Sequence, residues 1–162
     1  MKAKLREVNT FCSGRSKGMF PCLGCAKCPF VLKGKEFIHP HSEQIQLQGY
    51  YTCASKFAIH VVTCLCGLIY TGETTQMVKS HISQQRLSIN LGNTTLPMSK
   101  HFLEKGHTVH QLRFFLLETV PPLERGGDRE LNLKRGAVWW INKLKSLYPS
   151  GLNKNYDLFL NL

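Results

Sequence analysis

Hydrophobic and polar side chains alternate from Phe57 to Thr63, and this two-residue period predicts a β-strand. A second apolar run, over residues 68–71, follows a short connection that contains glycine, so the two runs predict a hairpin. Gly72 is expected to end the second strand, and the hydroxyl of Thr74 is expected to cap a helix. Apolar residues then recur at helical spacing, at Val78, Ile82 and Ile89. The centre of the chain is therefore predicted to run strand, strand, helix.

Three further elements are expected after this central unit. Two threonines before Pro97 favour the start of a short helix over residues 98–105. Residues 111–118, QLRFFLLE, are apolar on both sides in their middle, which predicts a central strand covered by helices. Asp128 is expected to cap the longest helix, which has an apolar stripe at Ala137, Val138, Ile141 and Leu144. The order of elements predicts an α+β fold with a small antiparallel sheet flanked by helices.

The first third of the chain has weaker patterns. Residues 1–19 are polar and basic and show no sustained period, so we expect them to form a disordered N-terminus. Residues 20–56 hold four cysteines and one short alternating stretch, Gln44 to Gln48, and are expected to form a cysteine-rich module. The predicted sheet and helices occupy residues 57–157, and residues 158–162 are expected to form a C-terminal tail.

The charge of the chain narrows the classes of partner. Its 162 residues include 21 Lys and Arg against 10 Asp and Glu, a net charge of +11, and the sequence pI is near 9.5. This balance favours contact with the phosphates of DNA or RNA, although a basic and well-solvated surface gives the same composition. The sequence has no apolar run of about 20 residues and no secretory signal, so we expect an intracellular protein without a membrane partner or a small-molecule substrate.

Seven cysteines in a reducing compartment favour metal binding or free thiols over a disulfide framework. Cys22, Cys25 and Cys28 form two overlapping Cys-x-x-Cys turns, which suit a structural zinc. Such a site takes four ligands, and Cys53 is the preferred fourth. Alternatives remain for the ligand set: Cys64 and Cys66 can replace one member or complete a second site, and Cys12, His39 and His41 are held in reserve. The plainer interpretation is a small core of reduced cysteines without metal.

Four stretches of sequence together resemble a known family. They are CLCGLIYTGETTQ, KHFLEKGH, ERGGDRELNLKR and PSGLN, and the resemblance covers about Pro21 to Asp157. The hairpin resembles that of the GIY-YIG endonuclease domain, with Ala58-Ile59-His60 and Tyr70-Thr71-Gly72 at its two signature tripeptides. Taken together, the four stretches are similar to the version of this domain found at the end of Penelope-like retroelement polyproteins. The resemblance implies a retrotransposon-derived, metal-dependent nuclease fold, and a chain starting at Met1 would be a piece of a former polyprotein.

The family's catalytic positions are only partly kept. The resemblance places the second-strand tyrosine at Tyr70 and the late asparagine at Asn153, but the first-strand tyrosine is replaced by His60. The family's helix arginine and histidine are replaced by His81 and Gln85, which lie one turn apart on one face. The metal-binding glutamate is replaced by Gly136, which cannot coordinate Mg²⁺ or Mn²⁺. These departures favour a degenerate copy that folds but cuts poorly or not at all.

Three functions remain open from the sequence. The favoured one is a nuclease-impaired domain, in a nuclear setting, that binds DNA or RNA through a basic surface. The first alternative is an active endonuclease that uses a divalent metal, Mg²⁺ or Mn²⁺, with His60 as base beside Tyr70. The second is a zinc-stabilised interaction module. The candidate phosphate contacts are Lys79, Arg86, Lys100 and Arg113.

Overall fold

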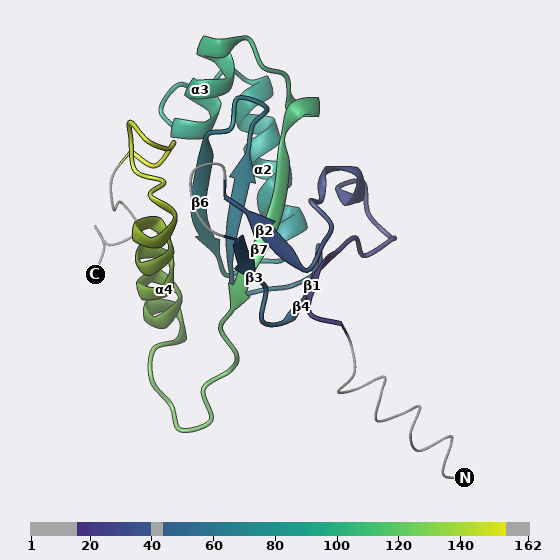
Figure 1. Ribbon diagram of the computed structural model, residues 1–162, viewed down its shortest axis with the longest axis vertical. Helices are drawn as coiled ribbons and strands as arrows, with labels where there is room; N and C mark the ends of the chain where they lie inside the picture. The colour runs from purple at the N-terminus through teal and green to yellow at the C-terminus, as the bar shows by residue number, and fades with distance from the viewer. Residues whose placement is uncertain (1–15, 40–43, 155–162) are drawn as a thin grey trace.

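A three-stranded antiparallel sheet lies at the centre of the protein, with the strand order β6-β5-β7 (Figure 1). The computed structural model of the chain describes residues 16–39 and 44–154. Strand β5 (Ala58–Thr63) pairs on one side with β6 (Ile69–Thr74) and on the other with β7 (Arg113–Thr119). The hairpin predicted from the sequence is therefore present. The expectation that residues 111–118 form the central strand is wrong, because β5 is central and β7 lies at an edge.

Strand β6 does not end at Gly72 but continues to Thr74, which corrects the sequence-based boundary. Gly72 pairs with His60 across the hairpin, and a Cβ atom at position 72 would lie 2.9 Å from the imidazole ring. The glycine is thus needed for a close approach of side chains and not for a turn. Thr74 does not cap the helix either, since its hydroxyl accepts a hydrogen bond from the backbone N–H of Gln76.

Helices and a small hairpin cover the two faces of the sheet (Figure 1). On one face lies α2 (Val78–Asn90), against which α3 (Pro97–Lys105) packs. The other face is covered by α4 (Arg129–Leu144) and by the antiparallel pair β2 (Glu36–Ile38) and β3 (Gln44–Gln46). The ring centroids of Phe37 on β2 and Phe115 on β7 are 4.5 Å apart. Cover on both faces explains why the β7 sequence is apolar on both sides.

The three predicted helices are confirmed among the described residues. In α2, the predicted apolar positions Val78, Ile82 and Ile89 are all buried. Helix α3 ends at Gly106, whose φ of 69° gives a left-handed cap. The Asp128 side chain accepts a hydrogen bond from the backbone N–H of Leu131 at 2.9 Å and so caps α4 as expected. The remaining helical turns are single 3-10 turns, η1 (Cys28–Phe30) and η2 (Val109–Gln111).

The N-terminal part is more ordered than the sequence indicates. Strand β1 (Gly18–Phe20) pairs in parallel with β4 (Tyr50–Thr52), and Met19 is fully buried. The prediction of disorder is therefore wrong at residues 18 and 19, because burial of the methionine side chain stabilises a strand too short to show a period. Residues 1–15 and the expected tail at 158–162 lie outside the described residues.

One hydrophobic core joins the cysteine-rich module to the sheet. A single cluster of buried residues extends from Met19, through Tyr51 and Cys53, to the central sheet and Leu152. The module at residues 20–56 thus shares its apolar interior with the rest of the protein. None of the described helices has both the length and the apolar character needed to span a membrane.

Candidate functional site

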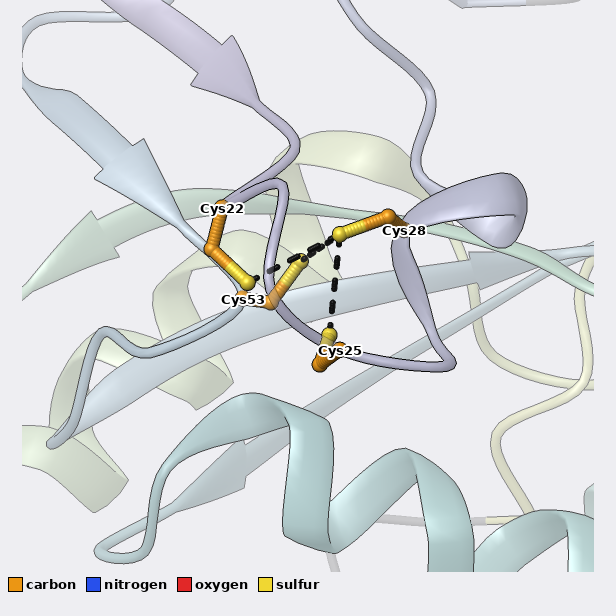
Figure 2. Close-up of side chains that lie close together, drawn as sticks. All are labelled: Cys22, Cys25, Cys28 and Cys53. Carbon is orange, nitrogen blue, oxygen red and sulfur yellow. Dashed lines mark hydrogen bonds between the residues drawn. The ribbon is translucent and has the colours of Figure 1, made fainter.

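Four cysteine sulfurs converge beside the first turn of α2 (Figure 2). The parallel pairing of β1 with β4 brings Cys22, two residues after one strand, next to Cys53, which directly follows the other. Cys25 comes from the loop between β1 and η1, Cys28 is the first residue of η1, and all four sulfur atoms point toward one another (Figure 2). The preferred ligand set predicted from the sequence is therefore brought together by the fold.

The spacing of these sulfurs fits a tetrahedral metal. The Cys28 sulfur lies 3.7 Å from that of Cys22, 3.7 Å from that of Cys25 and 3.9 Å from that of Cys53. Thiolates bound at about 2.3 Å to a tetrahedral Zn²⁺ lie about 3.8 Å apart. The four cysteines could therefore hold a metal ion such as zinc, with one ligand already inclined to ionise. A hydrogen bond to the Cys25 backbone lowers the pKa of the Cys28 thiol to about 6, while burial raises the pKa values of Cys25 and Cys53.

The cysteine cluster also supports α2 through the backbone. Helix α2 has no side-chain cap at its N-terminus. Its first two N–H groups, those of Val78 and Lys79, donate to the carbonyl oxygens of Ser55 and Cys53 at 3.0 and 2.9 Å. The loop that carries Cys53 thus satisfies donors that would otherwise lack a partner.

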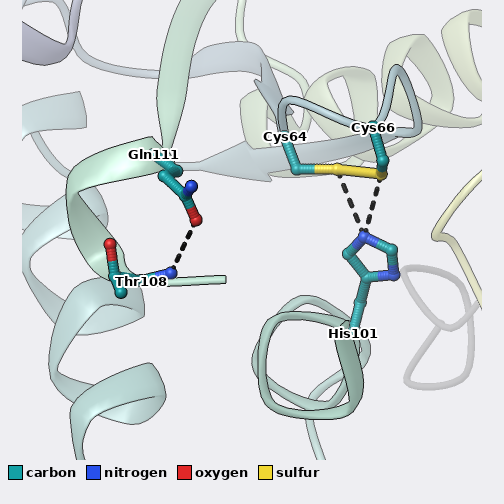
Figure 3. The surroundings of a disulfide bond; sticks show 5 residues. All are labelled: Cys64, Cys66, His101, Thr108 and Gln111. Atoms are coloured by element: carbon teal, nitrogen blue, oxygen red, sulfur yellow. Dashed lines mark hydrogen bonds between the residues drawn. A yellow bond between two sulfur atoms is a disulfide. The ribbon is translucent and has the colours of Figure 1, made fainter. Parts of the chain in front are cut away.

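A second ligand group lies in the connection between β5 and β6 (Figure 3). It consists of Cys64, Cys66, His101 on α3 and His107 just beyond α3, with the four ligand atoms within 4.8 Å of one another. The sequence had suggested a second site at the two cysteines but had missed both histidines. The signal was present, because Cys-x-Cys followed by His-x5-His supplies a four-ligand set.

In the structure, Cys64 and Cys66 are joined by a disulfide. The Nε2 atom of His101 lies 3.2 and 3.1 Å from the two sulfur atoms (Figure 3). The backbone N–H of Thr108 donates to the Gln111 side chain at 2.8 Å and fixes the chain directly after His107. As reduced thiolates, the two cysteines would complete a two-sulfur, two-nitrogen set that also suits zinc.

Four of the predicted catalytic residues meet on the α2 face of the sheet. The ring centroid of His60 lies 4.6 Å from that of His81 and 6.5 Å from that of Tyr70. The side-chain nitrogen of Gln85 lies 3.3 Å from Nε2 of His81, one helical turn away. The predicted grouping of these residues by β5, β6 and α2 is therefore present in the structure.

His60 is the most unusual member of this group, because it is fully buried and neither ring nitrogen has a hydrogen-bond partner. Burial, with the charge of His81 as a smaller cause, holds the pKa of His60 well below its usual value. Burial also lowers the pKa of His81. Both shifts favour the neutral imidazoles, and no carboxylate among the described residues contributes to either shift.

Gly136 does not lie with these four residues. A Cβ atom at position 136 would meet Ile59 Cδ1 at 2.7 Å and an oxygen of Glu118 at 3.4 Å. Successive side chains of a strand point to opposite faces, so Ile59 and Gly136 lie across the sheet from His60. The nearby carboxylate, Glu118, accepts a hydrogen bond from Trp140 Nε1 at 2.8 Å. The glycine allows α4 to approach β5 closely, which the sequence alone did not indicate.

Asn153 is buried, and its side chain joins the segment after α4 to β6 by hydrogen bonds. Its Oδ1 accepts hydrogen bonds from the Thr71 N–H at 2.9 Å and the Ser146 hydroxyl at 2.7 Å. Its Nδ2 donates to the Thr71 carbonyl at 2.7 Å. These contacts hold the middle of β6, next to Tyr70 and Gly72, and indicate a structural role.

The candidate phosphate contacts are distributed unevenly. Arg86 and Arg113 are both near the ring of Phe30, whereas Lys100 lies 3.9 Å from the Glu104 carboxylate on the exposed side of α3. Lys79 is half-buried in the first turn of α2. Of the reserve metal ligands, His39 is buried with Nε2 2.7 Å from the Leu144 carbonyl and does not belong to either cluster. Cys12 and His41 lie outside the described residues.

Comparison of the chain with protein families, curated proteins and solved structures gives no match.

Proposed function

We propose that the protein is a nuclease-impaired domain of the GIY-YIG type, of retroelement origin, that binds DNA or RNA and contains structural zinc. The observation that carries this proposal is the group formed by His60, Tyr70, His81 and Gln85. Side chains from two strands and a helix meet there, at the positions that the family resemblance assigns to catalysis, but no carboxylate lies among these four residues. Hydrolysis assisted by Mg²⁺ or Mn²⁺ needs oxygen ligands for the ion, and this group does not provide a carboxylate.

Binding without cleavage is supported by the charge of the protein. Its net charge of +11 attracts phosphates whether or not chemistry follows. Neither Arg86 nor Arg113 has a carboxylate partner among the described residues, so both keep their charge available for a ligand. Zinc would be held by the four cysteines near α2, and its part is to fix the loops that carry them.

The alternative of an active endonuclease rests on His60 acting as a general base. The burial that lowers the pKa of His60 favours the neutral imidazole that a base needs, but it also makes that imidazole a weaker proton acceptor. The complete burial of His60 argues against this role, because a base must come within hydrogen-bond reach of the attacking water. The impaired domain is therefore the better-supported proposal.

Fluorescence anisotropy with a labelled duplex and a labelled single strand of about 30 nucleotides tests the binding function. We expect both to bind with little sequence preference, and the affinity to fall linearly on a logarithmic plot as salt rises from about 50 to 200 mM. Because the contacts are electrostatic, an unrelated sequence of the same length should bind equally. Absence of any anisotropy change at the lowest salt would contradict the proposal and leave a zinc-stabilised interaction module as the remaining function.

A further inference from the structure

Two arginines from different elements share one aromatic ring at the junction of the cysteine-rich module and the sheet. The guanidinium carbon of Arg86 on α2 lies 4.3 Å from the centroid of the Phe30 ring, and that of Arg113 on β7 lies 5.7 Å from it. Phe30 ends the η1 turn, and its neighbour Val31 bridges to Phe114 of β7. Three segments that are far apart in sequence therefore meet at this ring.

Neither positive charge at this junction has a carboxylate partner within residues 16–39 and 44–154. Arg86 Nε is buried without a hydrogen-bond partner. One terminal nitrogen of Arg113 donates to the carbonyl oxygens of His110 and Leu112 at 2.7 and 2.8 Å, which orients the guanidinium without a counter-charge. Both guanidinium groups contact the same ring and lack a carboxylate partner among the described residues, so the junction attracts anions, and the planar guanidinium matches the oxygen spacing of a phosphate.

We propose that Phe30, Arg86 and Arg113 form an arginine clamp for the phosphodiester backbone of a nucleic acid, which rests on the proposed binding function. The arginines lie against the ring and limit its use for stacking a base, so the clamp contacts phosphates and carries no sequence preference. Arg86 lies five residues after His81, which separates the two side chains by about 140° around the axis of α2. They therefore lie on opposite sides of the buried stripe of this helix. The clamp is therefore a binding site separate from the histidine group.

The cysteine cluster positions this clamp. Phe30 lies only two residues after Cys28, and its backbone N–H donates to the carbonyl of Lys27 within the same turn. The first turn of α2, which leads to Arg86, is bonded to the carbonyl of Cys53. Release of a metal from the cysteines would free both the ring and the start of the helix. Binding at the clamp should consequently depend on metal that never touches the nucleic acid.

The clamp is tested by anisotropy with the same duplex, using the metal-loaded full chain. The double variant Arg86→Gln/Arg113→Gln should bind about tenfold more weakly and have a salt slope reduced by about 1–2. The control is Arg125→Gln/Arg135→Gln, which removes the same charge from exposed positions and should weaken binding less than about threefold. Arg86→Lys, which keeps the charge but loses the planar fork, should fall between them, and circular dichroism checks that each variant is folded.

Metal dependence gives a second result. Chelation should lower the affinity of the wild-type chain to that of the clamp double variant and should have little further effect on that variant. Equal weakening in the clamp and control variants would overturn the clamp while leaving the binding function intact. Failure of the wild-type chain to bind any nucleic acid would overturn both. An equal effect of chelation on the wild type and the double variant would overturn the link to metal.

Discussion

At the scale of single residues, Asn153 stabilises the fold more than its place near the end of the chain suggests. Asn153→Ala should lower the free energy of unfolding by about 2–4 kcal/mol, because the buried N–H and C=O groups of Thr71 lose their Asn153 partners at a cost of about 1–3 kcal/mol each, whereas the Ser146 hydroxyl keeps Thr71 Oγ1. Urea denaturation measures the change. Asn132→Ala, at an exposed position of α4, is the control and should cost less than about 0.5 kcal/mol.

The buried His60 should make the protein sensitive to acid. The pKa of His60 is lowered in the folded state, so protonation favours the unfolded chain. The stabilisation is complete above the unfolded pKa of about 6.5 and is lost below it, at up to about 1.4 kcal/mol per pH unit for each excluded proton. Denaturation at several pH values should show this loss, with a contribution from His81, whose pKa is also lowered.

His60→Leu should make that pH dependence shallower, since the excluded proton no longer exists. His110→Leu removes an exposed histidine and is the matched control. If His60→Leu retained the full acid sensitivity of the wild type, the buried imidazole would not be its source.

The sequence identified a residue of the candidate site only where it matches a motif on a predictable strand or helix. His60, Tyr70, His81 and Gln85 were selected by the resemblance to the GIY-YIG family, on a hairpin and a helix that the sequence pattern predicts, and the structure groups them. Gly136 could not be assigned to a face, because a glycine adds nothing to an apolar stripe. Its contact with Ile59 shows that a glutamate there would point away from the histidines. A carboxylate restored at position 136 would therefore not reach them.

At the scale of elements, removal of metal should loosen α2 selectively. The first N–H groups of α2 are bonded to the loop that carries Cys53, whereas α4 is capped by its own Asp128. Amide hydrogen exchange should therefore become faster over residues 78–90 after chelation and stay unchanged over residues 129–144. Mass spectrometry of peptic peptides measures both helices in one sample. Equal exchange in α2 before and after chelation would contradict this coupling.

Native mass measurement provides the control for that experiment. The wild-type chain should lose a metal-sized mass on chelation, and Cys25→Ser should bind less metal, because a tetrahedral site loses one of its four ligands. The comparison also shows whether the second ligand group, with His101 and His107, retains an ion of its own. A chain of unchanged mass after chelation would leave the cysteines as free thiols.

The longer elements were predictable, and of the three-residue strands only β3, in the alternating stretch Gln44 to Gln48, was indicated by the sequence. Strand β5 and helices α2, α3 and α4 each span enough residues for a period to emerge. Strands β1, β2 and β4 have three residues each, and the parallel pairing of β1 with β4 depends on contacts between distant segments. That pairing brings Cys22 to Cys53, so the spacing of cysteines predicted the ligands but not the means of assembling them.

At the scale of the whole molecule, the cysteine-rich module and the sheet act as one body with one core. The module caps α2, supplies Phe30 to the two arginines and covers one face of the sheet through Phe37. The histidine group lies on the other face, without a carboxylate. On our proposal, a nucleic acid binds through charge at the module's edge, while the histidine group lacks the carboxylate that metal-assisted hydrolysis needs.

Incubation of supercoiled plasmid with the metal-loaded protein in Mg²⁺ and, separately, in Mn²⁺ tests this account most directly. We predict that the plasmid migrates more slowly while protein is bound and is recovered fully supercoiled after the protein is digested. Nicked or linear plasmid that appears with the wild-type chain and is absent with Tyr70→Phe would contradict the account, because it would show that the histidine and tyrosine group cuts without a carboxylate.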